Sequence, residues 1–275
     1  MREPTLRRPP PRTRRRLARA WWSALGLEAS TADVGPHRIH WLETGAGEPL
    51  LLLHGLSGSS RWWHRNIPAL AGRYRLLIPD VIGFGRSRCP GPLPDLPSLA
   101  ATLAGWIDVT GADRVHLMGH SMGGHIALHI AARHPERVRR LVLVDAAGIP
   151  RPLTPRNILR FAYEVAPPRQ WGDPTFLPVI VGDAFSAGPF NVLRGLRNTL
   201  RDDVRPLLSE VRAPTLVVWG RHDTIIPLEH GKVLRESIPG ARLLVLEDAY
   251  HNPMVDRPSD FDAAVLNFLG GAEVG

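Results

Sequence analysis

One serine in this sequence lies in a setting that favours nucleophilic chemistry. Residues 119–123 read Gly-His-Ser-Met-Gly, so Ser121 has a glycine two positions away on each side. A predicted strand over 114–118 precedes it, and a predicted helix over 122–133 follows it. A serine on a sharp strand-to-helix turn exposes its hydroxyl, and small neighbours are needed because backbones approach closely there. The pattern predicts Ser121 as a nucleophile.

A histidine and an aspartate follow this serine in the chain and are of the types that would activate it. A serine hydroxyl is a weak nucleophile until a base removes its proton, and the base needs a carboxylate to fix its tautomer. His251 and Asp223 each lie just beyond a predicted strand. Because ligands bind where parallel strands end, we expect both side chains to reach Ser121. The chain order serine, aspartate, histidine agrees with this arrangement.

Asp145 is a rival for the acid, because it also ends a predicted strand. We favour Asp223, since the turn from Gly220 to Pro227 offers a defined loop. Asp145 is expected to bond the backbone locally instead.

Acyl chemistry also requires donors for a developing oxyanion. The residue after the nucleophile, Met122, is expected to supply one backbone N–H, and the loop after His54-Gly55 the other, through Leu56. Losing one such donor typically raises a barrier by about 3–4 kcal/mol.

Strands and helices alternate along most of the chain. Apolar runs such as Leu50–Leu53 suit strands that are buried on both faces of a parallel sheet. The alternation predicts an α/β fold with a mostly parallel central sheet and helices on both faces. Predicted strands cover 28–34, 37–43, 50–53, 75–79, 114–118, 138–144, 215–219 and 242–246, and predicted helices cover 97–109, 122–133, 229–238 and 259–269.

A proline-rich segment interrupts this alternation. Residues 149–208 contain helical stretches near 155–165 and 190–203, and a structureless loop of this length would be unusual. We predict a small helical cap here, between core segments 28–148 and 209–275. Its aromatic residues are expected to supply part of an apolar pocket wall, and they are Phe161, Tyr163, Trp171, Phe176, Phe185 and Phe190.

The positive charge is concentrated in an N-terminal arm, residues 1–27. Residues 1–19 hold eight arginines and one glutamate, a net charge of +7 out of +8 for the whole chain. We expect a disordered arm that could make weak contact with membranes or polyanions. We expect no specific nucleic acid partner. The single cysteine, Cys89, excludes an internal disulfide and is compatible with a cytoplasmic location, peripheral to a membrane if the arm binds one.

Five segments, in order and spacing, resemble the α/β-hydrolase superfamily over roughly residues 28–270. The matching segments are residues 54–59, 80–87, 119–124, 220–227 and 251–253. The resemblance implies a Ser121-Asp223-His251 triad, a helical cap and no cofactor, with 80–87 mainly structural. Tyr250 and Asp256 depart from residues that are commoner in the family, but neither has a triad role.

These features predict a hydrolase that transfers an acyl group of a small molecule to water. We rank carboxylic ester hydrolysis of a mainly apolar substrate first. Carbon–carbon bond hydrolysis of a dienoate-like diketone is the alternative, with Arg194 and Arg197 binding its carboxylate. A non-catalytic receptor on the same fold is the rival from another class.

Two side-chain pairs have alternative interpretations. His125 and His129 are four residues apart on a predicted helix and share a face, but without a metalloprotease motif we expect a packed or exposed face and no metal. Trp62 and Trp63 follow the predicted oxyanion loop, and either a pocket wall or helix packing would explain them.

Overall fold

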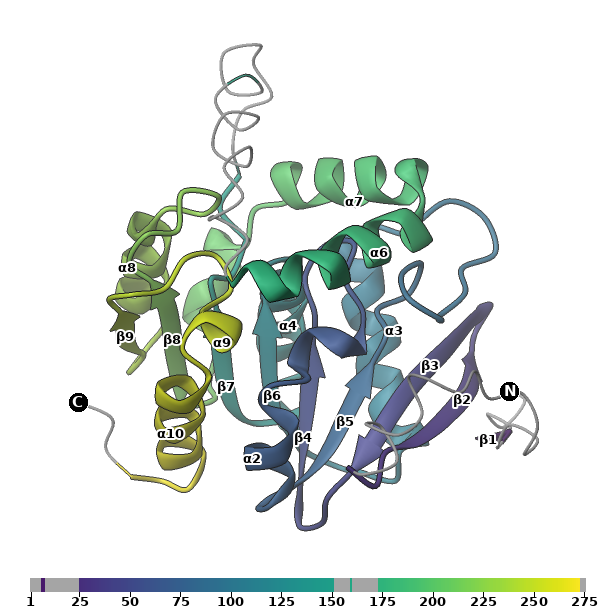
Figure 1. Ribbon diagram of the computed structural model, residues 1–275, viewed down its shortest axis with the longest axis horizontal. Helices are drawn as coiled ribbons and strands as arrows, with labels where there is room; N and C mark the ends of the chain where they lie inside the picture. Colours follow the sequence, from purple (N-terminus) through teal and green to yellow (C-terminus); the bar gives the residue numbers. More distant parts are fainter. Residues whose placement is uncertain (1–5, 8–24, 151–158, 160–172, 273–275) are drawn as a thin grey trace.

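The computed structural model describes residues 6–7, 25–150, 159 and 173–272. Within them, one nine-stranded sheet has the strand order β1-β2-β3-β5-β4-β6-β7-β8-β9 (Figure 1). The strands are β1 (Leu6–Arg7), β2 (Glu28–Val34), β3 (His37–Thr44), β4 (Glu48–Leu53), β5 (Tyr74–Pro79), β6 (Val115–His120), β7 (Val138–Val144), β8 (Thr215–Gly220) and β9 (Arg242–Leu246).

The sheet is antiparallel at one side and parallel through its centre. Pairings from β1 to β3 and on to β5 are antiparallel, whereas β5, β4, β6, β7, β8 and β9 pair in parallel. This confirms the predicted mostly parallel α/β sheet. It also brings the carboxyl ends of β6, β7 and β8 to one edge, where the predicted chemistry-bearing residues lie.

Helices cover both faces of the sheet. The helices are α2 (Ile67–Ala71), α3 (Leu96–Val109), α4 (Met122–Arg133), α8 (Leu228–Ser237), α9 (Pro253–Asp256) and α10 (Pro258–Leu269). Residues of α3, α4 and α8 join one buried cluster, and residues of α2, α9 and α10 join the other. Side chains of β4 alternate between the clusters: Leu51 and Leu53 face the first, Leu50 and Leu52 the second. All four are fully buried, which explains the unbroken leucine run.

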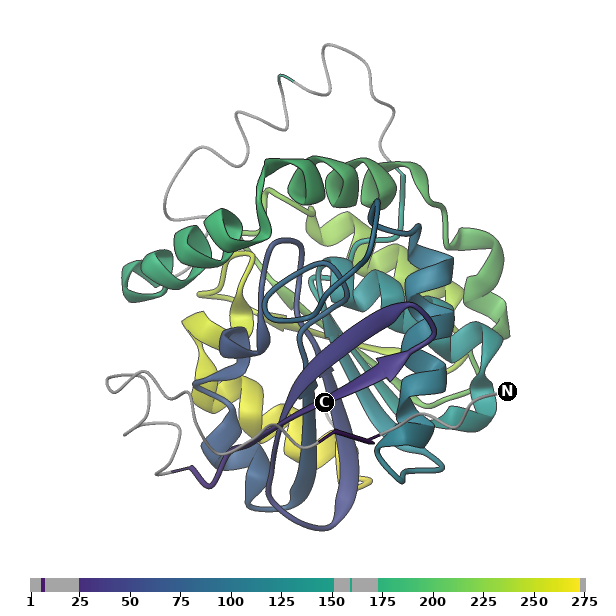
Figure 2. The same cartoon turned by 90° about the vertical axis from the view of Figure 1, so that its right-hand side faces the viewer.

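Two helices that follow β7 and precede β8 in the chain lie above the carboxyl ends of the strands. They are α6 (Leu177–Ala187) and α7 (Pro189–Arg201), flanked by the short helices η4 (Pro174–Phe176) and η5 (Arg205–Glu210). Gly188, at φ 75°, separates α6 from α7, and both views show the pair crossing over the sheet (Figures 1 and 2). No single described helix is long and apolar enough to cross a membrane; residues Pro174–Ala187 and Pro189–Arg201, bent by 100°, pass together by length and composition only.

Side-chain amides of α7 hold this helix to the core. Asn191 donates to the Gly83 carbonyl at 3.0 Å, and Asn198 donates to the Pro94 carbonyl at 2.8 Å. Helix α7 corresponds to the helix predicted at 190–203. Helix α6 was not predicted from the sequence. The boundaries of the cap at 149–208 stay a prediction.

Several sequence expectations fall outside the described residues. They are the helix near 155–165, the aromatic residues Phe161, Tyr163 and Trp171, and nearly all of the arm at 1–27. Within the arm, the structure describes residues 6–7 and 25–27, and residues 6–7 form β1, which pairs antiparallel with β2 and sets Leu6 opposite Ala32. This strand pairing was not expected from an arm interpreted as disordered.

Candidate active site

Ser121 lies on a strained turn between β6 and α4. Its φ of 53° is in the left-handed region that non-glycine residues rarely adopt, and such strain is concentrated at functional sites. Its backbone N–H donates to the Val144 carbonyl at 2.9 Å, which ties the turn to β7. A Cβ at Gly119 would lie 2.3 Å from the Gly123 oxygen, and one at Gly123 would lie 2.4 Å from the Leu53 oxygen. Both glycines are therefore required by close backbone approach, as the motif predicted.

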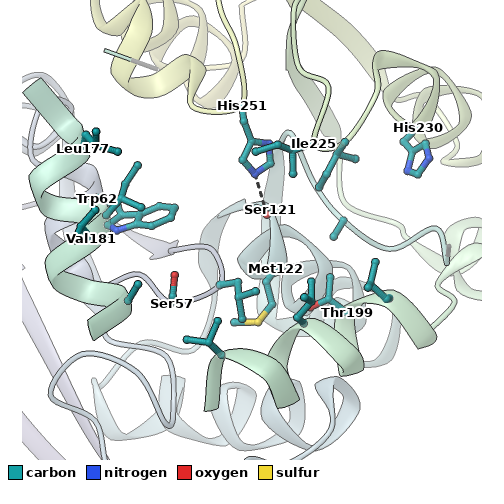
Figure 3. A pocket seen from close by; sticks show the side chains of 18 of the residues that line it. Ser57, Trp62, Ser121, Met122, Leu177, Val181, Thr199, Ile225, His230 and His251 are labelled. Carbon is teal, nitrogen blue, oxygen red and sulfur yellow. Dashed lines mark hydrogen bonds between the residues drawn. The ribbon is translucent and has the colours of Figure 1, made fainter. Parts of the chain in front are cut away.

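The three predicted triad side chains meet at this turn. His251 Nε2 lies 3.2 Å from Ser121 Oγ (Figure 3). On the other side of the ring, His251 Nδ1 lies 2.8 Å from Asp223 Oδ2. The other Asp223 oxygen accepts the backbone N–H groups of Ile225 and Ile226 at 2.8 and 3.0 Å. A carboxylate held in this way favours the proton on Nδ1, which leaves the Nε2 lone pair facing the serine hydroxyl.

Asp145, the rival acid, lies beside Asp223, and its described hydrogen bonds go to β8 and not to His251. Its Oδ1 accepts the Gly220 N–H at 3.0 Å, a contact with β8 and not the local bond that we expected. Burial, and then the charge of Asp223, raise the pKa of Asp145 well above its usual value. The neutral form of Asp145 is therefore favoured, which makes it a poor partner for an imidazolium.

The loop after β4 approaches the serine as predicted. A Cβ at Gly55 would lie 3.2 Å from Ser121 Cβ, so the next residue, Leu56, is adjacent to the nucleophile. His54 fixes this loop: its Nδ1 donates to the Gly55 carbonyl at 2.8 Å, and its Nε2 accepts the Val81 N–H at 2.8 Å. Burial lowers the pKa of His54, which keeps the ring neutral and suited to both bonds.

A buried aspartate of α6 ties the cap helices to this loop, and the sequence analysis missed it. Asp183 accepts hydrogen bonds from Ser59 Oγ at 2.7 Å and from Trp62 Nε1 at 3.1 Å, and it pairs with Arg61. These partners lie more than 120 residues away in sequence, so no local pattern indicates them. Trp62 is thereby fixed as one wall of the cavity described next, whereas Trp63 packs in the core.

An apolar cavity of about 600 Å³ contains Ser121 and His251. Among the described residues that line it, the polar side chains are Ser57, Ser121, Thr199, His230 and His251, and none is Asp, Glu, Lys or Arg. The apolar lining comes from the core and from both cap helices (Figure 3), and it includes Leu56, Met122, Leu177, Ile180, Val181, Ala184, Phe185, Val192, Leu196, Ile225 and Ile226. Arg194 and Arg197, the alternative carboxylate-binding residues, do not line the cavity.

Away from the cavity, two histidines of α4 converge on one carboxylate. The Nε2 atoms of His125 and His129 lie 2.6 and 2.5 Å from the same Asp202 oxygen, at the end of α7. Both rings are buried, in agreement with a packed face, but sequence reasoning missed Asp202. Both Nδ1 atoms are buried and have no hydrogen-bond partner among the described residues.

The two unpartnered Nδ1 atoms favour hydrogen bonding over metal binding at this cluster. With Nε2–H on both rings, each ring donates to Asp202, and the buried Nδ1 atoms need no acceptor. A metal bound through Nε2 would require Nδ1–H on both rings, and two buried donors would then lack acceptors. We interpret the His125–Asp202–His129 cluster as a clamp between α4 and the end of α7.

Replacing Asp202 with alanine is expected to destabilise the protein by about 2–3 kcal/mol, because two buried N–H donors lose their acceptor. Thermal unfolding near pH 7 should show a Tm lower by about 5–10 °C. Burial acts to raise the pKa of Asp202, but hydrogen bonds from the two histidines outweigh it and hold the pKa well below the usual 3.8. The stabilisation is therefore present above pH 3.8 and lost as the pH falls below it, so the variant and wild type should converge in acid.

The neighbouring Asp203 provides a matched control. It makes a surface ion pair with Arg205, and Asp203→Ala is expected to change the stability by less than about 1 kcal/mol. Equal Tm values for Asp202→Ala and Asp203→Ala would contradict the clamp.

Comparison with known proteins agrees with this geometry. A family model described as the alpha/beta hydrolase fold matches residues 48–177 and 181–258. The chain belongs to the α/β-hydrolase family. The resemblance predicted from five sequence segments is confirmed.

Three proteins illustrate what this α/β hydrolase is similar to. The 2-hydroxy-6-oxononadienedioate/2-hydroxy-6-oxononatrienedioate hydrolase of Burkholderia vietnamiensis is 34% identical over 84% of this chain and 91% of its own length. The crystal structure of a membrane phospholipase A is 29% identical, with a TM-score of 0.79 over 93% of this chain and 89% of that one. A thermophilic esterase from Thermogutta terrifontis is 27% identical, with a TM-score of 0.75 over 89% of this chain and 98% of that one.

Proposed function

We propose that this α/β hydrolase is a carboxylic ester hydrolase for an uncharged ester with an apolar acyl group. Ser121 is the nucleophile, His251 the base and Asp223 the acid that orients the base. The observation that carries the proposal is the hydrogen-bonded chain Asp223–His251–Ser121 lining an apolar cavity. The similarity to a phospholipase and an esterase supports it.

The proposed mechanism has two acyl-transfer steps. His251 Nε2 takes the Ser121 proton while Oγ attacks the ester carbonyl, and the backbone N–H groups of Leu56 and Met122 hold the oxyanion. His251 then gives its proton to the departing alcohol, and an acyl-enzyme remains. A water molecule next loses a proton to His251 and attacks the acyl-enzyme, after which His251 returns that proton to Ser121 as the acid product leaves. Asp223 stabilises the imidazolium in both steps.

Carbon–carbon bond hydrolysis is the second candidate, because the Burkholderia vietnamiensis relative is named for dienedioate substrates, which carry two carboxylates. The described lining of the cavity holds no cationic side chain to pair with such groups. Burying an unpaired carboxylate among apolar side chains would cost several kcal/mol. The described part of the cavity lining therefore favours the uncharged ester.

A series of chromogenic esters tests this proposal. Each methylene of the acyl chain that the cavity buries should contribute about 0.8 kcal/mol, or roughly fourfold in kcat/KM, until the cavity is full. We expect kcat/KM to rise from acetate to a medium-chain ester and then to fall. A flat ester profile, together with rapid turnover of a dienoate-like diketone, would reverse the ranking.

A pair of variants on α6 sharpens the experiment. Ala184 lines the cavity, whereas Ser186 is exposed on the same helix. Ala184→Phe fills part of the cavity and should move the optimum to shorter acyl chains, while Ser186→Phe should leave it unchanged.

A further inference from the structure

The outward sides of α6 and α7 carry an unusual share of the exposed apolar side chains. Five large hydrophobic residues are exposed in the part of the chain that the structure describes, and four of them lie on these two helices. Their exposed fractions are 59% for Val181, 91% for Phe185, 86% for Phe190 and 64% for Leu193. Single exposed hydrophobic residues need no explanation, but a group on two adjoining helices indicates a binding surface.

The same surface is positively charged. Helix α7 contains Arg194, Arg197 and Arg201, all exposed, and no acidic residue. The one acidic residue of α6, Asp183, is buried and bound to Arg61, so it does not offset these charges. Together with the four exposed hydrophobic residues, the three arginines define what we call the cap face.

The cap face is continuous with the cavity. Val181 and Phe185 belong to both the exposed surface and the cavity lining, so apolar side chains extend from the solvent to Ser121. On α7, Val192 and Leu196 line the cavity while Phe190 and Arg197 point outward. A helix with one apolar side on the pocket and one mixed apolar and cationic side has the composition of an interfacial helix.

We propose that the cap face docks on an anionic phospholipid surface. The phenylalanines enter the boundary between headgroups and acyl chains, and the arginines contact phosphate-bearing headgroups. A second copy of this chain would bring its own arginines against those of the first, which opposes a symmetric dimer through this face. Passage of a lipid ester from the surface into the cavity rests on the proposed function, whereas the docking itself does not.

Vesicle sedimentation with the full-length Ser121→Ala chain tests docking apart from catalysis. We expect binding to vesicles of phosphatidylcholine with about one-third phosphatidylglycerol, and much weaker binding to phosphatidylcholine alone. Phe185→Ser with Phe190→Ser should lower the partition coefficient by about tenfold or more. Changing the three arginines of the cap face to glutamine should also lower it by about tenfold or more.

Three exposed arginines elsewhere provide a control with the same loss of charge. They are Arg212, Arg235 and Arg242, which lie on the surface of the α/β core domain. Changing all three to glutamine should leave partitioning nearly unchanged. Thermal unfolding of every variant verifies that it is folded. Equal loss in the control and cap-face triples would overturn the proposal, because general charge would then explain binding.

A fluorescent label gives a second readout that the basic arm cannot mimic. In a Cys89→Ser background, an environment-sensitive dye on Phe190→Cys should shift to the blue when anionic vesicles are added. The same dye on Glu236→Cys, an exposed site on α8, should not. Three results would each overturn docking on lipid. They are an unshifted emission of the dye at position 190, unchanged partitioning of the phenylalanine variant, and a wild-type dimer in light scattering that is monomeric in the phenylalanine variant.

Discussion

Replacing Ser121 with alanine is expected to lower kcat for an ester by about 10⁴–10⁶-fold, because base and oxyanion donors then have no nucleophile to assist. The fold should survive: the side chain makes its one described hydrogen bond to His251, and alanine meets the same backbone strain at φ 53°. Purified variant and wild type are compared by kcat and by thermal unfolding. A rate within about tenfold of wild type, with an unchanged Tm, would contradict the assignment.

Asp223→Asn is expected to lower kcat by about 10²–10⁴-fold through the tautomer of His251. The asparagine oxygen would keep the bonds from Ile225 and Ile226, which turns its NH₂ group toward His251 Nδ1. Nδ1 must then accept, Nε2 carries the proton, and the base faces Ser121 without a lone pair. The effect should fall on kcat, with little change in stability.

Asp145→Asn is the matched control for that experiment. Burial and the charge of Asp223 raise the pKa of Asp145, so the carboxyl is already neutral and asparagine resembles it closely. The asparagine oxygen can still accept the Gly220 N–H. A larger loss of kcat for Asp145→Asn than for Asp223→Asn would make Asp145 the functional acid.

The triad geometry could be predicted because it depends on features that repeat along the chain. Each of Ser121, Asp223 and His251 follows a strand of a parallel sheet, and parallel strands bring their carboxyl ends to one edge. The glycines around Ser121 are fixed by backbone contact, which leaves a clear local sequence signal. Sequence therefore located the strands that carry these three residues and the residues themselves.

The parts that sequence reasoning missed depend on contacts between distant segments. The roles of Asp183 and Asp202 can be recognised only when α6 and α7 are packed on the core. Their hydrogen-bond partners lie 73 to 124 residues away in the sequence. Helix α6 itself was missed because Pro178 and Gly182 weaken its local pattern.

The aromatic residues that were predicted to form one pocket wall have different surroundings in the structure. Phe176 is buried against Trp62, Phe185 lies at the cavity and in solvent, and Phe190 faces outward. Amphipathic spacing gives two sides to a helix, but it does not say which side meets a core and which meets solvent.

The central claim, that Ser121 forms a covalent acyl-enzyme, is tested most directly by its reaction with a fluorophosphonate. Intact mass and peptide mapping should show one adduct per chain, on Ser121, and none in Ser121→Ala. Labelling should be slow in Asp223→Asn, because the hydroxyl is no longer activated. An adduct on another serine, such as Ser57 in the same cavity, or equal labelling of Ser121→Ala, would contradict the mechanism.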